Sequence, residues 1–188
     1  MQDQCAAACG GINLFEFSSD GIHVHPIELT PQRREELEAH ILLCYTGEAR
    51  LSSRIHEHVW GNFERGDRRI TELLLQMKDS AYRCKEILEH GSLEEFGKIL
   101  SMQYACAKQL DASTTNSVIE NLFDVLAPHI YGGKPGGAGG GGCVFFCCKD
   151  QRHKEIAKEK ITALGCEVME YGFDFEGVVV KEEQALTP

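Results

Sequence analysis

The segment that bears most directly on the fold reads GGKPGGAGGGG at residues 132–142 and continues as CVFFCC at residues 143–148. Eight of the 19 glycines in the chain lie in the first run. Glycine costs roughly 0.5–1 kcal/mol relative to alanine in regular structure, so such a cluster indicates backbone that needs positive φ or approaches another group closely. A flexible linker is the alternative, but a linker joins solvated ends, whereas the apolar run is expected to be buried. We therefore predict a glycine turn that enters a strand.

Two phosphate-binding motifs can be compared with this turn. Residues 137–142 fit the pattern G-x-G-x-x-G, but the dinucleotide motif needs a strand before the glycines and a helix after them. Here the sequence predicts a helix before and a strand after. A Walker loop needs Lys and then Ser or Thr after its second glycine, whereas Cys143 follows Gly142. What remains is a glycine turn with Lys134 as a candidate counter-charge for an anion.

The remaining sequence predicts an α+β fold, because several helices are followed by alternating strands and a helix. Asp20-Gly21 between two β-type runs is a hairpin signal. Ser92 and Glu95 form a capping box directly after Gly91, which predicts two antiparallel helices with a short link. The predicted elements are strands at 12–17 and 22–29, a helix at 30–39, a strand at 41–45, helices within 50–127, one of them starting near Ser117, a strand at 143–148, a helix at 151–164, and strands at 166–171 and 178–181.

Composition excludes several classes of protein. The 188 residues are 43% hydrophobic and 26% charged, which is typical of a globular chain and not of a disordered or fibrous one. The formal net charge of -10 makes nucleic acid a poor partner, since its phosphates would be repelled. The longest apolar run is residues 143–148, far below the ~20 residues of a membrane helix, and the amino terminus has no signal-peptide pattern.

The cysteines indicate a reducing, cytoplasmic setting. Their number, nine, is odd, and several lie within apolar runs, so we expect buried thiols rather than a disulfide framework. The group Cys143, Cys147 and Cys148 lacks the spacing of zinc ligands, and no metal site is predicted. The thiols expected to be buried are Cys44, Cys84, Cys106 and Cys147.

Several segments resemble the GHMP family of small-molecule kinases. Residues 134–142 are similar to the third, glycine-rich motif of that family, and residues 2–11 resemble its mid-chain segment. Residues 42–52 and 124–129 resemble more narrowly its sugar-kinase branch, the L-fucokinases and D-glycero-D-manno-heptose 7-phosphate kinases. The resemblance covers nearly the whole chain in one order.

The resemblance implies a fold and a division of the chain. Residues 37–188 are expected to form a ferredoxin-like C-terminal GHMP-kinase domain with a helical hairpin insertion. Residues 1–36 are expected to be a remnant of the N-terminal kinase domain, a helix start plus a β-hairpin. Family members are about double this length, and no stretch here resembles their Pro-x-x-x-Gly-Leu-Gly-Ser-Ser-Ala phosphate loop or their magnesium ligands.

The resemblance also implies site residues. Asp3 matches the family's general base, which takes a proton from the sugar hydroxyl, although a carboxylate so near a terminus could equally be frayed and solvated. The glycine turn is expected to place open amides against substrate and phosphates. Arg50 is a candidate anion clamp, with pairing on a helix surface as its alternative. The residues expected to bind substrate or phosphate are Lys134, Gly137, Ala138, Gly139, Gly140, Gly141, Gly142, Thr46, Gly47 and Arg50.

The functional expectation is the C-terminal portion of an ATP-dependent sugar kinase of the fucose or heptose-phosphate type. ATP and Mg²⁺ are implied by the resemblance, with the Mg²⁺ ligands expected outside this sequence. The chain is expected to be inactive without a complementary N-terminal half. The alternatives are a catalytically inactive remnant or interaction module that keeps the fold, and a homo-oligomer in which exposed hairpins pair.

Overall fold

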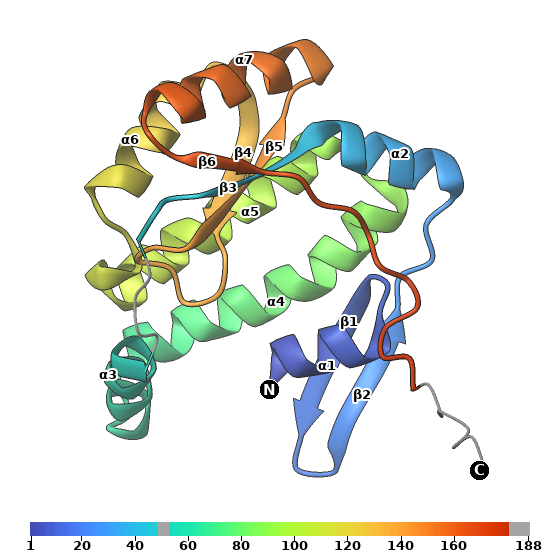
Figure 1. Ribbon diagram of the computed structural model, residues 1–188. Coiled ribbons are helices and arrows are strands. Elements are labelled where there is room, and N and C mark those ends of the chain that lie inside the picture. The colour runs from blue at the N-terminus through green and yellow to red at the C-terminus, as the bar shows by residue number, and fades with distance from the viewer. Residues whose placement is uncertain (49–52, 181–188) are drawn as a thin grey trace, which may run out of the picture. The chain divides into compact units, whose positions relative to one another are not determined.

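A computed structural model describes residues 1–48 and 53–180 (Figure 1). Internal contacts divide the chain into two compact units, residues 29–171 and residues 1–28 together with the segment from Gly172 onward. The domain division predicted at residues 36 and 37 remains a prediction. No helix in the described ranges is long and apolar enough to cross a membrane.

The smaller unit contains a short helix and a β-hairpin. Helix α1 (Gln2–Cys9) contains no buried residue. Strands β1 (Asn13–Ser18) and β2 (Gly21–Pro26) pair antiparallel through a turn at Ser19 and Asp20, which confirms the predicted hairpin. Gly21 is the first residue of β2 and pairs with Ser18. The amide of Val178 donates to the carbonyl of Ala8, but residues 178–180 form no strand. The strand predicted at 178–181 is therefore wrong over its described part, and Lys181 lies outside the described residues.

The larger unit is built on a four-stranded antiparallel sheet with the order β4-β5-β3-β6. One strand, a group of helices, two strands, a helix and a last strand follow one another along the chain, which is the split β-α-β arrangement of ferredoxin-like folds. The predicted α+β class is confirmed. The strands are β3 (Ile41–Tyr45), β4 (Ile130–Pro135), β5 (Cys143–Cys148) and β6 (Glu167–Met169). The helices are α2 (Pro31–His40), α3 (Ser53–Glu64), α4 (Arg68–His90), α5 (Leu93–Leu110), the 3₁₀ helix η1 (Ala112–Thr114), α6 (Ser117–Leu126) and α7 (Gln151–Ala163).

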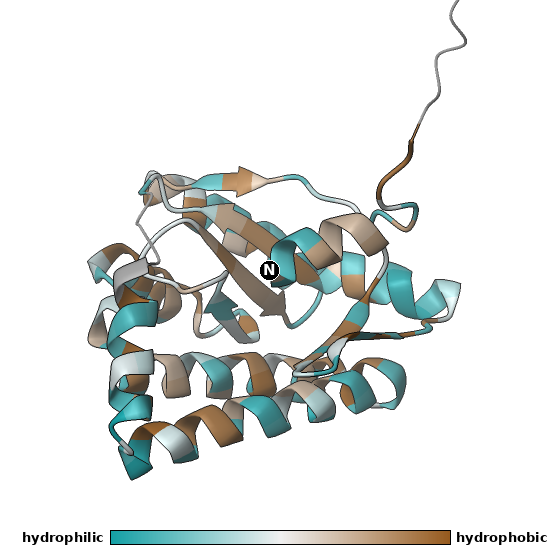
Figure 2. Ribbon diagram, turned by 90° about the horizontal axis from the view of Figure 1, so that it is seen from below, coloured by the Kyte–Doolittle hydropathy of each residue, from teal (hydrophilic) through white to brown (hydrophobic). Residues whose placement is uncertain are grey.

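Helices cover both faces of this sheet. Leu42 of β3 pairs with Phe146 of β5, and Cys44 pairs with Val144, so these four side chains share one face. They pack into the main core with apolar residues of α6 and α7. Helix α5 packs against β4 and β5, and α4 packs against α5. The pair α4 and α5 therefore lies on the side of the strands opposite to α6 and α7 (Figure 1). Figure 2 shows largely apolar strands between helices banded with apolar and polar residues.

Local signals explain where the helices begin. Ser92 accepts from the amide of Glu95, and the Glu95 carboxylate accepts from the amide of Ser92, which confirms the predicted capping box. Helix α6 starts at Ser117 as predicted, but its cap is Asn116, whose side chain accepts from the amide of Ile119. Pro31 occupies the first turn of α2.

The sequence reasoning missed β4. Residues 132–135 were predicted to belong to the glycine turn, yet Gly132 pairs with Cys147 and Gly133 with Phe146 in the antiparallel ladder of β4 and β5, directly after a register shift between Ile130 and Gly132. A strand therefore precedes the turn, and the expectation of a helix directly before it is wrong. The thiols of Cys44, Cys106 and Cys147 are buried as predicted, whereas Cys84 is only partly buried, and all nine cysteines are free.

Candidate functional site

The glycine loop connects β4 to β5 and includes residues 136–142. Its backbone uses the left-handed region at Gly137, Gly139, Gly140 and Gly142, with φ between 58° and 78°. Residues other than glycine rarely adopt these φ angles, because their β-carbon would crowd the backbone. The prediction that the glycine cluster serves positive φ is confirmed.

Several amides of this loop are already bound within the chain. Gly140 N donates to the carbonyl of Thr114 at 2.6 Å, and Gly142 N donates to the carbonyl of Glu48 at 2.6 Å. Gly139 N donates to Gly136 O at 3.3 Å. The amides of Gly137, Ala138 and Gly141 make no hydrogen bond to the described protein. These three amides are therefore the candidate donors to an anion.

The turn after β3 lies directly against the glycine loop. Thr46 is buried, and both its amide and its hydroxyl donate to the carbonyl of Gly142 at 3.0 Å. Gly47 follows with a φ of 81°. The structure thus brings together two segments in which the sequence predicted residues that bind substrate or phosphate. Arg50, the predicted anion clamp, lies outside the described residues.

Two residues that the sequence analysis did not single out complete this arrangement. The Asn116 side chain donates through Nδ2 to Gly140 O at 3.1 Å and to Glu48 Oε2 at 2.9 Å. Thr114 of η1 is buried and supplies the carbonyl that holds Gly140. The only signal in the sequence was an Asn before a helix start, which indicates a cap but not a contact with a distant loop.

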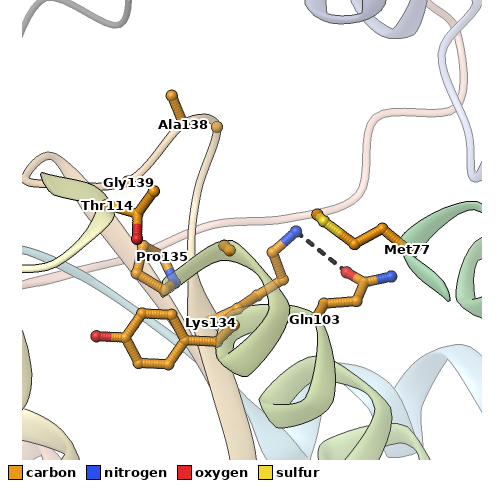
Figure 3. A pocket seen from close by; sticks show the side chains of 10 residues that line it. Met77, Gln103, Thr114, Lys134, Pro135, Ala138 and Gly139 are labelled. Carbon is orange, nitrogen blue, oxygen red and sulfur yellow. Dashed lines mark hydrogen bonds between the residues drawn. The ribbon is translucent and has the colours of Figure 1, made fainter. Parts of the chain in front are cut away.

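Lys134 lies at the base of the loop in a small cavity of about 30 Å³, which has room for a group the size of water. Its ammonium donates to Gln103 Oε1 at 3.2 Å, and Figure 3 shows it pointing toward Gln103 with Met77 beside them. Burial lowers the pKa of Lys134, an effect partly offset by Cys84 nearby. The cavity is lined by Met77, Gln103, Tyr104, Ala107, Thr114, Lys134, Pro135, Gly137, Ala138 and Gly139.

Asp3 lies in the other compact unit. It occupies the first turn of α1 and is exposed. A metal-binding group of three or more His, Cys, Asp or Glu side chains is absent from the described ranges.

Residues 84–165, which include the α5 helix, both strands of the glycine hairpin and α7, match the family described as GHMP kinases C terminal. The chain contains a GHMP kinase C-terminal domain. The predicted family is thereby confirmed.

Sugar kinases are prominent among the relatives of this GHMP kinase domain. The chain is 30% identical over 179 residues to a D-glycero-alpha-D-manno-heptose 7-phosphate kinase of Campylobacter jejuni, covering 94% of this chain and 52% of that protein. It is 30% identical over 160 residues to a bifunctional fucokinase/GDP-fucose pyrophosphorylase of Arabidopsis thaliana, covering 82% of this chain and 15% of that protein. The chain thus spans about half, or less, of the length of these curated relatives.

Solved structures agree on the fold of this GHMP kinase domain. A D-glycero-D-manno-heptose 1-phosphate kinase of Bacteroides thetaiotaomicron matches with a TM-score of 0.65 and 26% identity, over 94% of this chain and 46% of that one. The mevalonate kinase of L. major matches with a TM-score of 0.70 over 82% of this chain and 45% of that one. At 16% identity, the second likeness concerns the fold alone.

Proposed function

We propose that this chain is the C-terminal portion of an ATP-dependent sugar kinase that transfers the γ-phosphate of ATP to a hydroxyl of fucose or a heptose phosphate. The observation that supports this most is the alignment with the Campylobacter jejuni heptose phosphate kinase, which extends over 94% of the chain at 30% identity. The free thiols fit a cytoplasmic location for this activity.

The residues of the larger unit suit one side of such a reaction. Phosphoryl transfer depends mainly on positioning and on neutralising charge. The amides of Gly137, Ala138 and Gly141 supply donors for phosphate oxygens, and Lys134 supplies positive charge at the base of the loop. Thr46 and Gly47, together with Arg50, are proposed to lie near the sugar.

ATP supplies the phosphoryl group, and Asp3 is proposed to accept the proton of the attacking hydroxyl. An exposed carboxylate at the start of α1 is free to contact a solvent-borne substrate. Because the chain spans 52% of the heptose phosphate kinase, we propose that turnover also needs a polypeptide equivalent to the part of that relative which this chain does not match.

The test is a titration of the chain with MgATP, alone and with D-glycero-D-manno-heptose 7-phosphate or L-fucose, followed by an assay of ADP release. Each measurement is made with and without a second polypeptide corresponding to the unmatched part of the relatives. We expect ADP release with one sugar class, only when that polypeptide is present, and its loss in Asp3→Asn. Turnover by the isolated chain would contradict the need for a complement. No turnover in any combination would contradict the kinase assignment.

A non-catalytic interaction module is the second candidate. It is favoured by the engagement of Gly139, Gly140 and Gly142 amides within the chain and by the small volume at Lys134, about 30 Å³. On this alternative, MgATP fails to bind even with the second polypeptide, while the two polypeptides still associate. A self-associating form, in which hairpins pair, would appear as a dimer by sedimentation.

A further inference from the structure

We propose that Asn116 is a positioning residue that holds the glycine loop and the turn after β3 in one fixed arrangement. The proposal deepens the proposed function, on which its importance for phosphoryl transfer rests. The hydrogen bonds themselves belong to the fold and can be tested without any turnover.

The orientation of the Asn116 side chain is determined by its three partners. Its Oδ1 accepts from the amide of Ile119 at 2.9 Å, while its Nδ2 donates to Gly140 O and to the Glu48 carboxylate. Reversal of the carboxamide would place a donor against the Ile119 amide and an acceptor against two oxygens. One planar group therefore caps α6 and reaches two loops at once.

The base of this contact is rigid. Helix α6 follows Asn116 directly, and Ile119, Leu122 and Leu126 on that helix are fully buried in the main core. Because Asn116 is the cap of a helix anchored in this way, its amide group has little freedom to move. The glycines of the loop have more freedom to move than Asn116, because they have no side chains to pack.

The hydrogen bonds of Asn116 are part of one connected network that includes the glycine loop and the turn after β3. Gly140 donates to Thr114 O, two residues before Asn116, and its own carbonyl accepts from Asn116. Gly142 donates to the carbonyl of Glu48, whose carboxylate also accepts from Asn116. The bond to Glu48 is charge-assisted and so is stronger than a neutral one. Asn116 thus links the loop and the turn from outside the sheet.

This arrangement matters for the proposed site because each linked segment is assigned a different substrate. Thr46 and Gly47 are proposed to contact the sugar, and residues 137–142 to contact phosphate. Transfer requires the two reacting groups to be held in a narrow range of geometries. A loop rich in glycine has many backbone states, so a fixed contact reduces the ordering required when a ligand binds.

Asn116 has two roles that substitutions can separate. One is the cap of α6, and the other is the clamp, by which we mean the hydrogen bonds from its Nδ2 to Gly140 and Glu48. Asn116→Ser keeps an acceptor for the Ile119 amide but lacks the NH₂ donor, whereas Asn116→Ala loses both. Asp150→Ser is the control, because Asp150 caps α7 by accepting from the amide of His153 and its side chain makes no hydrogen bond to the glycine loop. Asp150 also pairs with Nδ1 of the His153 ring at 2.8 Å, so this control removes one side-chain pair together with the charge of the cap. Glu48→Gln keeps an acceptor for Asn116, and Glu48→Ala removes it.

Amide hydrogen exchange on the whole chain measures the clamp directly. In Asn116→Ser we expect the amides of Gly140 and Gly142 to exchange about tenfold faster than in the wild type. The amide of Val144 in β5 is expected to exchange at the wild-type rate. The thermal midpoint is expected to equal that of Asp150→Ser. Glu48→Gln is expected to resemble the wild type, and Glu48→Ala to resemble Asn116→Ser at Gly142. Exchange within twofold of the wild type in Asn116→Ser, or equal acceleration throughout β5, would overturn the proposal.

Turnover provides a second measurement if the complemented chain is active. Asn116→Ser is then expected to lower kcat about tenfold with little change in KM for either substrate, since the clamp positions groups rather than binding them. A change confined to KM would overturn the positioning role. If exchange accelerates as expected while no combination turns over, the proposed kinase function fails and the clamp remains.

Discussion

Gly97 of α5 and Gly132 of β4 meet backbone to backbone, with no room for a side chain on either. A β-carbon on Gly132 would overlap the carbonyl oxygen of Gly97, and one on Gly97 would lie 2.5 Å from Cβ of Tyr131. Neither residue has a positive φ, so close approach is the reason for both glycines. The contact sets the distance between α5 and β4 and thereby allows Lys134, two residues further along β4, to reach Gln103 of α5.

Gly132→Ala is expected to lower the free energy of unfolding by about 1–3 kcal/mol or more, because inserting a methyl group here forces α5 away from the sheet. Chemical denaturation monitored by circular dichroism measures the change. Gly172→Ala is the control, since a β-carbon there meets no atom within 4 Å. Equal stability of the two variants would show that α5 can move aside without cost.

Gly139→Ala is expected to disturb the glycine loop more than Gly137→Ala. Both residues have positive φ, which costs an alanine roughly 1–2 kcal/mol, but only a β-carbon on Gly139 would also collide with the carbonyl of Thr114. We expect at least a tenfold weaker affinity for MgATP in Gly139→Ala than in Gly137→Ala, equivalent to about 1.4 kcal/mol, by calorimetric titration of the complemented chain. Similar affinities would indicate that the loop does not contact the nucleotide.

Lys134 predicts a dependence of stability on pH. Burial lowers its pKa in the folded chain below the ordinary value of 10.5, so folding is penalised while the group is charged in both states. The free-energy cost of burying the charged Lys134 is relieved as the pH rises from the lowered pKa of the folded chain toward 10.5, the ordinary pKa of the group. Relative to Lys134→Met, the wild type should therefore gain stability over this alkaline range, as measured by urea denaturation at several pH values. A constant difference between the two proteins would contradict the burial of the charge.

The thiols are expected to react in separate classes. Burial raises the pKa of Cys44, Cys147 and Cys148 to about 12, so these groups have almost no thiolate at pH 8. Cys9 is exposed. With a thiol reagent in the native state, Cys9→Ser should remove a fast phase, while the three buried thiols should react only at the rate of unfolding. Fast modification of Cys44 or Cys148 would show that the main core opens readily, and fast modification of Cys147 would show that α5 separates readily from β5.

Short-range signals in the sequence were sufficient for much of the fold. Ser92 and Glu95 marked a helix start, Asp20-Gly21 marked a hairpin, and the apolar run at 143–148 marked a central strand. Each of these depends on residues within a few positions of one another. The same reasoning failed at residues 132–135 and 178–180. At residues 132–135 the glycines have low strand propensity, and β4 forms because β5 pairs with it and α5 packs on it. At residues 178–180 the three valines have high strand propensity, but no strand forms.

The family assignment and the left-handed glycine turn followed from the sequence by itself, because both depend on which residues are adjacent in the chain. The joining of the two candidate loops was decided only by tertiary structure. Asn116 is 68 residues from Glu48 and 24 from Gly140, and nothing in their local sequence relates them. Their contact depends on the pairing of β3 with β5 and on the burial of α6 against that pair, and such non-local packing leaves no periodic pattern near the residues that it brings together.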